Sequence, residues 1–535
     1  MMKNAVLTRP DARHLLVRTG FAPTQAEVDR WAGKPPDLAV NTLLAEAKSA
    51  RTLYPLPQFV SAPPPIPQAY LKSREEQQAA RQQQLREGLE LKTWWLREMV
   101  DTPTPLAERM VLFWHNHFAT SQQKVIRSQA MWQQQQVLRA NALGNFSALL
   151  HAVAKTPAML VYLDGANSRK EAPNENFARE VMELFVLGES SQTAAGLGGY
   201  TEQDIKEAAR AFTGWSVERD DFSFKFRPAF HDNGTKTVLG VTGNLDGDQA
   251  LDVMLTQPAA ARFVVGKLWR EFVSPDPSSA VNSVAAQADL VRASDEFRRS
   301  GYDISVALRS LLLSNSFWAE DNRGSLIKSP VDLIVGTVRQ FGFTATDVTP
   351  LALKSAQLGQ NLLVPPNVKG WPGYTDWINA TSLLERKRFT EQLFRAVELK
   401  GESKTVPLAM AASGMMMDAA PQSAITNVPM STPGQAMKAE FAGGPQGRGG
   451  NPQMLNLLGR DGVLRVAEAM ARITFDPERW LETYGGHADR EPSDELKVQL
   501  EHALLAVPAT HSIAVGTVGV AYLRTLTLDP AYQLK

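Results

Sequence analysis

The sequence predicts a mainly α-helical protein: a multi-helix globular domain with a small β-hairpin excursion and a C-terminal helical module. Helix start signals recur, as at Thr201 with Asp204 and at Ser329-Pro330. Clear strand-like alternation of apolar and polar residues is found at residues 222–226. Because the chain has 535 residues, we expect it to divide into two or three domains.

The N-terminal part favours helices joined by one proline-rich connector. Residues 1–53 form a predicted helical segment, with helices at 11–19, 24–31 and 36–50. Six prolines between residues 54 and 68 predict an extended connector. A main helical domain over 69–400 follows. It starts with a long helix over 73–100 and continues with a helix that opens at Thr104-Pro105 and runs toward Phe118.

The rest of the chain combines one hairpin, further helices and a stretch of unusual composition. We expect residues 222–226 and 236–240 to form the two strands of the hairpin, with Asp232-Asn233-Gly234 as turn residues. The helix from Ser329-Pro330 should end at Gly342. Residues 401–452 are rich in Met, Gly and Pro and predict a flexible segment, and residues 453–535 predict a C-terminal helical module.

Composition excludes several classes of protein. The chain has 56 Lys and Arg against 56 Asp and Glu, so no global field favours nucleic acid or an anionic membrane. The absence of Cys excludes disulfides, thiolate nucleophiles and zinc fingers. There is no signal-peptide pattern and no apolar run that could span a membrane, so we expect a soluble, cytoplasmic protein, with the periplasm or export with a partner left open. No P-loop, Gly-x-Ser-x-Gly or His-Glu-x-x-His motif is present.

The segment 173–187 contains the strongest candidate site. It predicts one uninterrupted helix whose apolar face includes Phe177, Val181, Leu184 and Leu187. Glu180 lies within that apolar face. A carboxylate placed there must find partners, because burying it unpaired is costly.

Two further polar side chains border this face. Asn176 and Glu183 lie along its edge. Glu180 and Glu183 are therefore candidate catalytic groups that could share a proton, hold a divalent metal with His ligands from elsewhere, or fix Arg179. The ordinary alternative is an ion-pair network with arginines.

Two histidines and two polar loops supply the other candidates. On a continuous helix His115 and His117 point in different directions and cannot bind one ion; His117 should be buried among apolar residues and His115 should lie at the boundary. We predict His231 and His117 as assisting catalytic groups. The predicted binding residues, besides Asn176 and Arg179, are Asp232, Lys236 and Trp371. The alternatives are a self-bonded turn at 232–234 and a loop at 365–373 that fills the core with tryptophans.

A series of short motifs runs through residues 10–395 in a consistent order. They lie at 18–21, 108–110, 113–118, 157–159, 162–164, 174–185, 200–202, 209–215, 231–232 with 236, 327–330, 359–360 and 365–372. Together they resemble the large bacterial family called domain of unknown function 1800. The resemblance implies no established activity and no assigned catalytic residue. It implies a neighbouring gene for a phosphatase-like or sulfatase-like partner protein and, for many members, export.

Two functions follow as hypotheses. The first is an enzyme that acts on a glycan or another polar polymer through a buried carboxylate and histidine site. The second is a non-enzymatic helical scaffold or escort for the phosphatase-like or sulfatase-like partner, suggested by the connector, the Met-rich segment and the C-terminal module.

Overall fold

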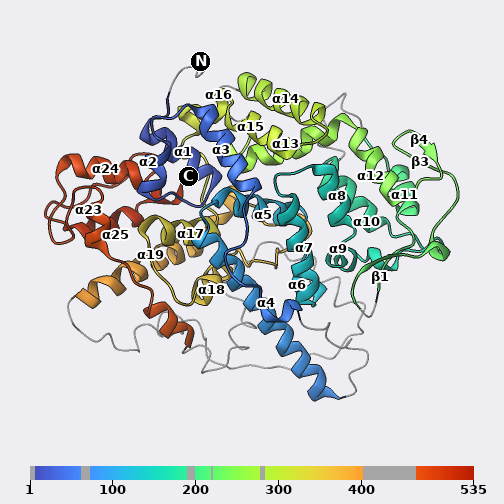
Figure 1. Cartoon of the computed structure of the whole chain (residues 1–535), viewed down its shortest axis with the longest axis horizontal. Coiled ribbons are helices and arrows are strands. Elements are labelled where there is room, and N and C mark those ends of the chain that lie inside the picture. Colours follow the sequence, from blue (N-terminus) through green and yellow to red (C-terminus); the bar gives the residue numbers. More distant parts are fainter. Residues whose placement is uncertain (1–5, 62–72, 190–198, 219–220, 278–282, 402–464) are drawn as a thin grey trace.

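The helices of the protein begin where the sequence places its caps. The computed structural model describes residues 6–61, 73–189, 199–218, 221–277, 283–401 and 465–535. Thr24, Ser73, Thr201 and Ser329 each close a capping box, in which the side chain accepts from a backbone amide three residues later. The prediction of a mainly α-helical fold with a small β element is confirmed (Figure 1).

The first half of the chain contains most of the helices around the core. They are α1 Arg9–Thr19, α2 Gln25–Trp31, α3 Pro36–Lys48, α4 Arg74–Asp101, α5 Pro105–His117, α6 Gln122–Val125, α7 Ser128–Asn141, α8 Phe146–Ala154, α9 Pro157–Tyr162, α10 Glu175–Glu180 and α11 Glu202–Ala211. Short 3-10 turns occur at η1 Gln58–Ser61 and η3 Gly165–Asn167. η1 falls within the predicted connector 54–68, whose residues 62–68 lie outside the described part.

The second half continues the helical pattern. Its helices are α12 Gly247–Thr256, α13 Pro258–Phe272, α14 Ser283–Arg299, α15 Ile304–Leu312, α16 Asn315–Trp318, α17 Pro330–Phe341, α18 Thr349–Gln357, α19 Ala380–Gly401, α23 Pro477–Glu482, α24 Asp494–Leu504 and α25 Gly519–Leu528. The 3-10 turns are η6 Pro228–Phe230, η7 Glu320–Asn322, η8 Tyr374–Trp377 and η9 Pro530–Gln533. No helix in the described ranges is long and apolar enough to cross a membrane.

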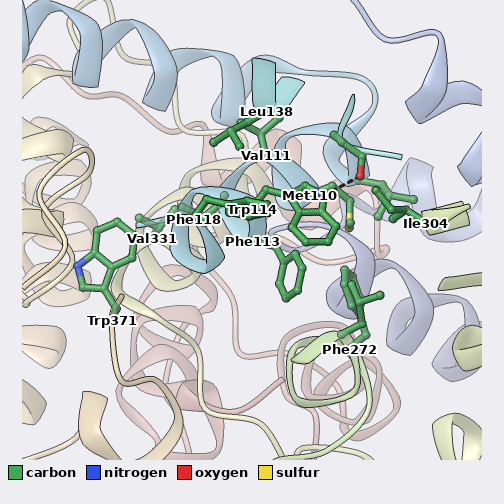
Figure 2. Packing of buried hydrophobic residues seen from close by; sticks show 14 of the residues in the cluster. Met110, Val111, Phe113, Trp114, Phe118, Leu138, Phe272, Ile304, Val331 and Trp371 are labelled. Carbon is green, nitrogen blue, oxygen red and sulfur yellow. Dashed lines mark hydrogen bonds between the residues drawn. The ribbon is translucent and has the colours of Figure 1, made fainter. Parts of the chain in front are cut away.

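Helix α5 lies at the centre of the core. Almost all of its side chains are buried, since it packs against neighbours on several sides. Figure 2 shows Val111, Met110 and Phe113 of α5 between Leu138 of α7 and Phe272 of α13. This helix therefore presents its C-terminal end, with His117, to the interior of the molecule.

The C-terminal residues pack directly on the rest of the protein. Arg13 of α1 donates to the carbonyl oxygens of Ala503 and Leu504 at 2.8 and 2.9 Å, and the hydroxyls of Thr337 and Tyr532 lie 2.9 Å apart. In Figure 1 the red helices α23–α25 lie beside the blue α1 and α2. One cluster of buried hydrophobic residues includes members from α1 to η9. Except for Gly401, the predicted flexible segment 401–452 lies outside the described residues.

The strand pairing differs from the predicted hairpin. Strand β1, Trp215–Val217, pairs with β2, Phe224–Phe226, and β3, Lys236–Val238, pairs with β4, Val241–Gly243. The expected pairing of 222–226 with 236–240 is wrong. Leu239 and Gly240 both have positive φ, 48° and 82°, as a two-residue hairpin turn requires. Local closure of this kind costs less chain entropy than a loop across residues 227–235.

The helix predicted over 173–187 changes character midway. After α10, residues Val181–Val186 form a π-helix, η4, and the amide of Leu187 donates to the carbonyl of Met182 across five residues at 2.8 Å. The prediction of one regular helix is therefore wrong in its second half. A π-turn is wider than an α-turn, so residues beyond Glu180 leave the 100° spacing that the sequence argument assumed.

Candidate functional site

A cavity of about 310 Å³ lies between α5, α13 and the loop 365–377. Its lining combines aromatic rings with more cationic than anionic side chains. The aromatic residues are Phe113, Trp371, Tyr374 and Trp377; the cationic ones are Arg109, Lys267, Arg270, Lys369 and Lys535; the anionic ones are Glu271 and Asp332. The cavity therefore has a net positive lining, which favours an anionic ligand.

The floor of the cavity is a closed network of ion pairs. Asp332, at the start of α17, is buried between Arg109 and Lys535, and the Lys535 Nζ lies 2.7 Å from its carboxylate. Burial alone would raise the pKa of Asp332, but these two cations hold it well below its ordinary value. Arg109 also pairs with Glu271 at 3.1 Å. These four residues satisfy one another and fix the floor.

Two cations on α13 are not neutralised in this way. Lys267 is half-buried, and its only hydrogen bond in the described ranges runs from Nζ to the carbonyl of Leu184 at 3.4 Å. Arg270, one turn later, is exposed and has no acidic partner among the described residues. Burial, and then the charge of Arg270, lower the pKa of Lys267 to about 8. An anion bound between these two side chains would relieve their mutual repulsion.

His117 lines the cavity, and its ring packs among aromatic side chains. Its Nε2 lies 3.0 Å from the carbonyl oxygen of Phe185, so Nε2 carries the proton in that bond. Burial, and then the charge of Lys267, hold the pKa of His117 well below its ordinary value. The ring is therefore neutral, and Nδ1 is an acceptor. Within the described residues, this buried Nδ1 has no hydrogen-bond partner.

The loop 365–377 brings Trp371 to the same cavity. The backbone amide of Trp371 donates to Asn116 Oδ1 at 2.7 Å, which ties the loop to the end of α5. Gly370 has φ +83° and packs against Asn116. The Trp371 ring is 4% exposed, and its Nε1 donor has no partner in the described part of the chain. Two residues that line one cavity, His117 and Trp371, thus each have a buried ring nitrogen without a partner, although buried polar groups normally find partners.

The π-helix η4 supplies backbone hydrogen-bond partners for two polar side chains of the cavity, Lys267 and His117. The last carbonyl groups of η4 have no amide donor within the helix. The Leu184 carbonyl accepts from Lys267 and the Phe185 carbonyl accepts from His117. Cationic and N–H donors are favourable at this end of a helix. The segment predicted to supply the catalytic carboxylates therefore also supplies backbone acceptors that orient Lys267 and His117.

Glu180 and Glu183 lie outside the lining of this cavity. Glu180 is half-buried and has no ion pair or hydrogen bond within the described ranges; burial, and then Glu183, raise its pKa. Glu183 lies 3.6 Å from Arg179, which also forms a bidentate pair with Glu202. Asn176 is exposed. Of the residues that line the cavity, Lys369 interacts electrostatically with both Glu180 and Glu183. Lys369 pairs with Glu189 at 2.7 Å, and its pKa is raised first by Glu189 and further by Glu180 and Glu183.

The segment 231–236 is held by partners of its own. The buried His231 has Nδ1 2.8 Å from the Thr213 carbonyl. Asp232 accepts from the Gly234 amide and pairs with Arg210 at 2.7 Å. Lys236 is buried and donates to the Gly234 carbonyl at 3.0 Å. The structure does not bring these residues to the cavity that contains His117 and Trp371.

His115 also differs from its expected place. It is 1% exposed and lies between the rings of Trp95 and Trp371, so the prediction of a boundary position is wrong. The cause is Trp371, whose loop covers this side of α5. His115 and His117 contact different sets of rings, as the helical geometry predicted. Among the described residues no group of three or more His, Asp or Glu side chains is arranged to hold a metal ion.

Lys267 and Arg270 are not among the site residues predicted from the sequence. A weak signal was present, because they lie one turn apart on a helix whose other charged residues are Arg262 and Glu271. Asp332 and Lys535 gave no such signal, since 203 residues separate them.

The profile of the family described as Protein of unknown function (DUF1800) matches residues 14–479. The chain therefore belongs to this family. Neither the curated proteins nor the solved structures compared with the chain gave a match.

Proposed function

We propose that the protein is an enzyme that binds an acidic glycan in the cavity between α5, α13 and the loop 365–377. One observation carries the proposal: His117 and Trp371, whose buried Nδ1 acceptor and buried Nε1 donor lack partners in the described ranges, line one cavity together with Lys267 and Arg270. A hydroxyl group can satisfy both the acceptor and the donor, and an anionic group suits the two cations. A sugar with a carboxylate or sulfate combines these features.

The residues take distinct roles in this proposal. Lys267 and Arg270 bind the anionic group, and Trp371 and Trp377 supply the apolar wall that sugar rings need. Neutral His117 accepts a proton from a ligand hydroxyl or from water, because its Nε2 proton is held by Phe185 and its Nδ1 is free to act as a base. Lys267 then offsets the negative charge that develops beside it. Glu180 and Glu183 remain predicted proton-transfer groups, near the side of the cavity that Lys369 lines.

The proposal is tested by binding and turnover with defined probes. Glucuronate and galactose 4-sulfate are titrated by calorimetry, and polygalacturonate, alginate and heparin are incubated with the protein while chain cleavage is measured. We expect Lys267→Met to weaken binding of the preferred monosaccharide by about ten- to a hundredfold. Lys206→Met, the same charge change at an exposed position of α11, is the matched control.

Two further variants separate binding from catalysis. Trp371→Phe removes one unpaired donor and should weaken sugar binding without lowering the melting temperature. His117→Phe should weaken binding of the acidic monosaccharide only by the loss of one hydrogen bond and should abolish turnover. Turnover that persists in His117→Phe would exclude His117 as the base, and binding that is unchanged in Lys267→Met would place the ligand elsewhere.

The escort hypothesis has less support from the described residues. Of the segments that suggested it, residues 62–68 of the connector and 402–452 lie outside them, and the C-terminal module packs on the main domain. Co-purification of the phosphatase-like or sulfatase-like partner with both the wild-type protein and Lys267→Met, without any turnover of the acidic polysaccharides, would favour the escort over the enzyme.

A further inference from the structure

A second cavity of about 410 Å³ adjoins the cationic one. The two share Pro275, Ile327 and Tyr374 in their linings, so Tyr374 lies at the boundary between them. A ligand that fills the first cavity can therefore continue past Tyr374 into the second.

The two cavities differ in chemistry. The first contains Lys267 and Arg270, which lack acidic partners in the described part of the chain. The described lining of the second contains no Lys or Arg; it offers hydroxyl, amide and carboxylate groups, among them Asn315, Ser316 and Asp321. Such groups form hydrogen bonds with neutral hydroxyls, and the Asp321 carboxylate repels anions.

Tyr374 is held at this boundary in an unusual conformation. Its φ is +50°, directly after Gly373 at +78°, and its side chain is 44% exposed. A bulky residue in the left-handed region costs free energy, and such residues concentrate at ligand sites. The strain places a large, amphipathic ring where the two cavities meet.

From these observations we propose that the ligand is an oligomer of mixed charge, in which an acidic sugar occupies the first cavity and an adjoining neutral sugar occupies the second, with the Tyr374 ring against the linkage between them. This inference rests on the proposed function and specifies its substrate class as an acidic heteropolysaccharide. A polymer with a charge on every unit fits poorly, because its second unit would face Asp321.

The test compares single units with mixed oligomers. One pair is glucuronate and a xylo-oligosaccharide that carries one glucuronate; the other is galactose 4-sulfate and a κ-carrageenan tetrasaccharide, in which sulfated and neutral units alternate. We expect the oligomer of the preferred pair to bind about tenfold or more tightly than its acidic unit alone. The two pairs also distinguish a carboxylate from a sulfate as the recognised anion.

A variant that fills only the second cavity supplies the decisive comparison. Ala285 lines that cavity on α14 and is exposed, so Ala285→Trp should fold and occupy the space, and Ala285→Ser is its control. Ala285→Trp should reduce oligomer affinity to that of the acidic unit and leave the affinity for the acidic unit unchanged.

The outcomes separate this inference from the proposed function. Equal binding of unit and oligomer, or oligomer binding that Ala285→Trp does not change, overturns the inference and leaves the proposed function standing. Failure of every probe to bind overturns both. Equal affinity for polygalacturonate fragments and mixed oligomers also overturns the requirement for a neutral neighbour.

Discussion

The charge state of Lys267 should determine how tightly the cavity binds an anion. The pKa of Lys267 is lowered from 10.5 to about 8 by burial and by Arg270. A bound anion favours the charged amine, so binding is coupled to proton uptake. We expect the affinity for an acidic sugar to be greatest below pH 8 and to fall as the pH rises above it, by up to about tenfold per pH unit. Calorimetric titration with glucuronate or galactose 4-sulfate between pH 6 and 10 measures this step.

Two variants check the assignment of that step. Lys267→Met should abolish it, and Arg270→Gln should move its midpoint to higher pH because one repulsive charge is removed. A step that survives in Lys267→Met would belong to another cavity group, such as Lys535, whose pKa burial lowers. The stability effect has the opposite sign to the binding effect. Since the folded pKa is lowered, the protonated amine destabilises the fold below pH 8, and Lys267→Met should be at least as stable as wild type at pH 7.

At the level of single elements, the loop 365–377 depends on one glycine. Gly370 has φ +83°, and a Cβ there would overlap Asn116 Oδ1 and lie 2.5 Å from the Asn116 carbonyl oxygen. We expect Gly370→Ala to displace Trp371 and to lower both the melting temperature and the affinity for the acidic sugar. Destabilisation of about 2 kcal/mol or more follows from backbone strain plus the clash. Thermal unfolding and calorimetry measure the two effects.

Gly373→Ala provides the matched control. Gly373 has a similar φ of +78°, but the nearest atom to its Cβ position is Trp377 Nε1 at 4.0 Å. This variant should show the cost of the backbone conformation, about 1 kcal/mol, without the clash. Equal destabilisation of the two variants would contradict the role assigned to the Gly370–Asn116 contact.

The elements also show which features the sequence could predict. The capping boxes at Thr201 and Ser329 are local, so the starts of α11 and α17 were predictable from neighbouring residues. The hairpin pairing depended on the two positive φ values at Leu239 and Gly240, and Leu239 is not a typical residue for such a turn. The π-helix η4 has no local signature, because its carbonyls are satisfied by His117 and Lys267 from distant helices.

At the level of the whole molecule, the C-terminal residues should be inseparable from the main domain. Residues 465–535 cover apolar side chains of α17 and α19, where Phe341, Phe394 and Phe475 form one aromatic cluster. We expect a chain that ends at residue 464 to bind a hydrophobic dye and to have a lower melting temperature, because this surface becomes exposed. Dye fluorescence and thermal unfolding test this expectation.

The removed residues can also be added back as a separate fragment, which tests whether their contacts alone account for the loss of stability. A separately produced fragment 465–535 should bind the shortened chain and restore part of its melting temperature. The control is the same fragment with Lys535→Met, which should restore less because Asp332 then keeps only Arg109 as its partner. An unchanged melting temperature in the shortened chain would show that the C-terminal residues fold independently.

The same scale explains why the site was only partly predictable. His117 and Trp371 were named from the sequence because a histidine on an apolar face and a rigid tryptophan loop are local anomalies. Their meeting in one cavity depends on Asn116 contacting Trp371 across 255 positions. Glu180 and Glu183 were the stronger sequence signal, yet neither lines the cavity: Glu180 is half-buried without an ion pair in the described ranges, and Glu183 lies near Arg179.

The pairing of Asp332 with Lys535 also limits how early the floor of the cavity can form during synthesis. A ribosome must add 203 more residues after Asp332 before Lys535 exists. At about 5–20 residues per second this delay lasts roughly 10–40 s. During that interval the nascent chain has Arg109 as its counter-ion for Asp332, and the floor of the cavity remains unfinished. The cavity should therefore be completed only after the helices that form most of its walls.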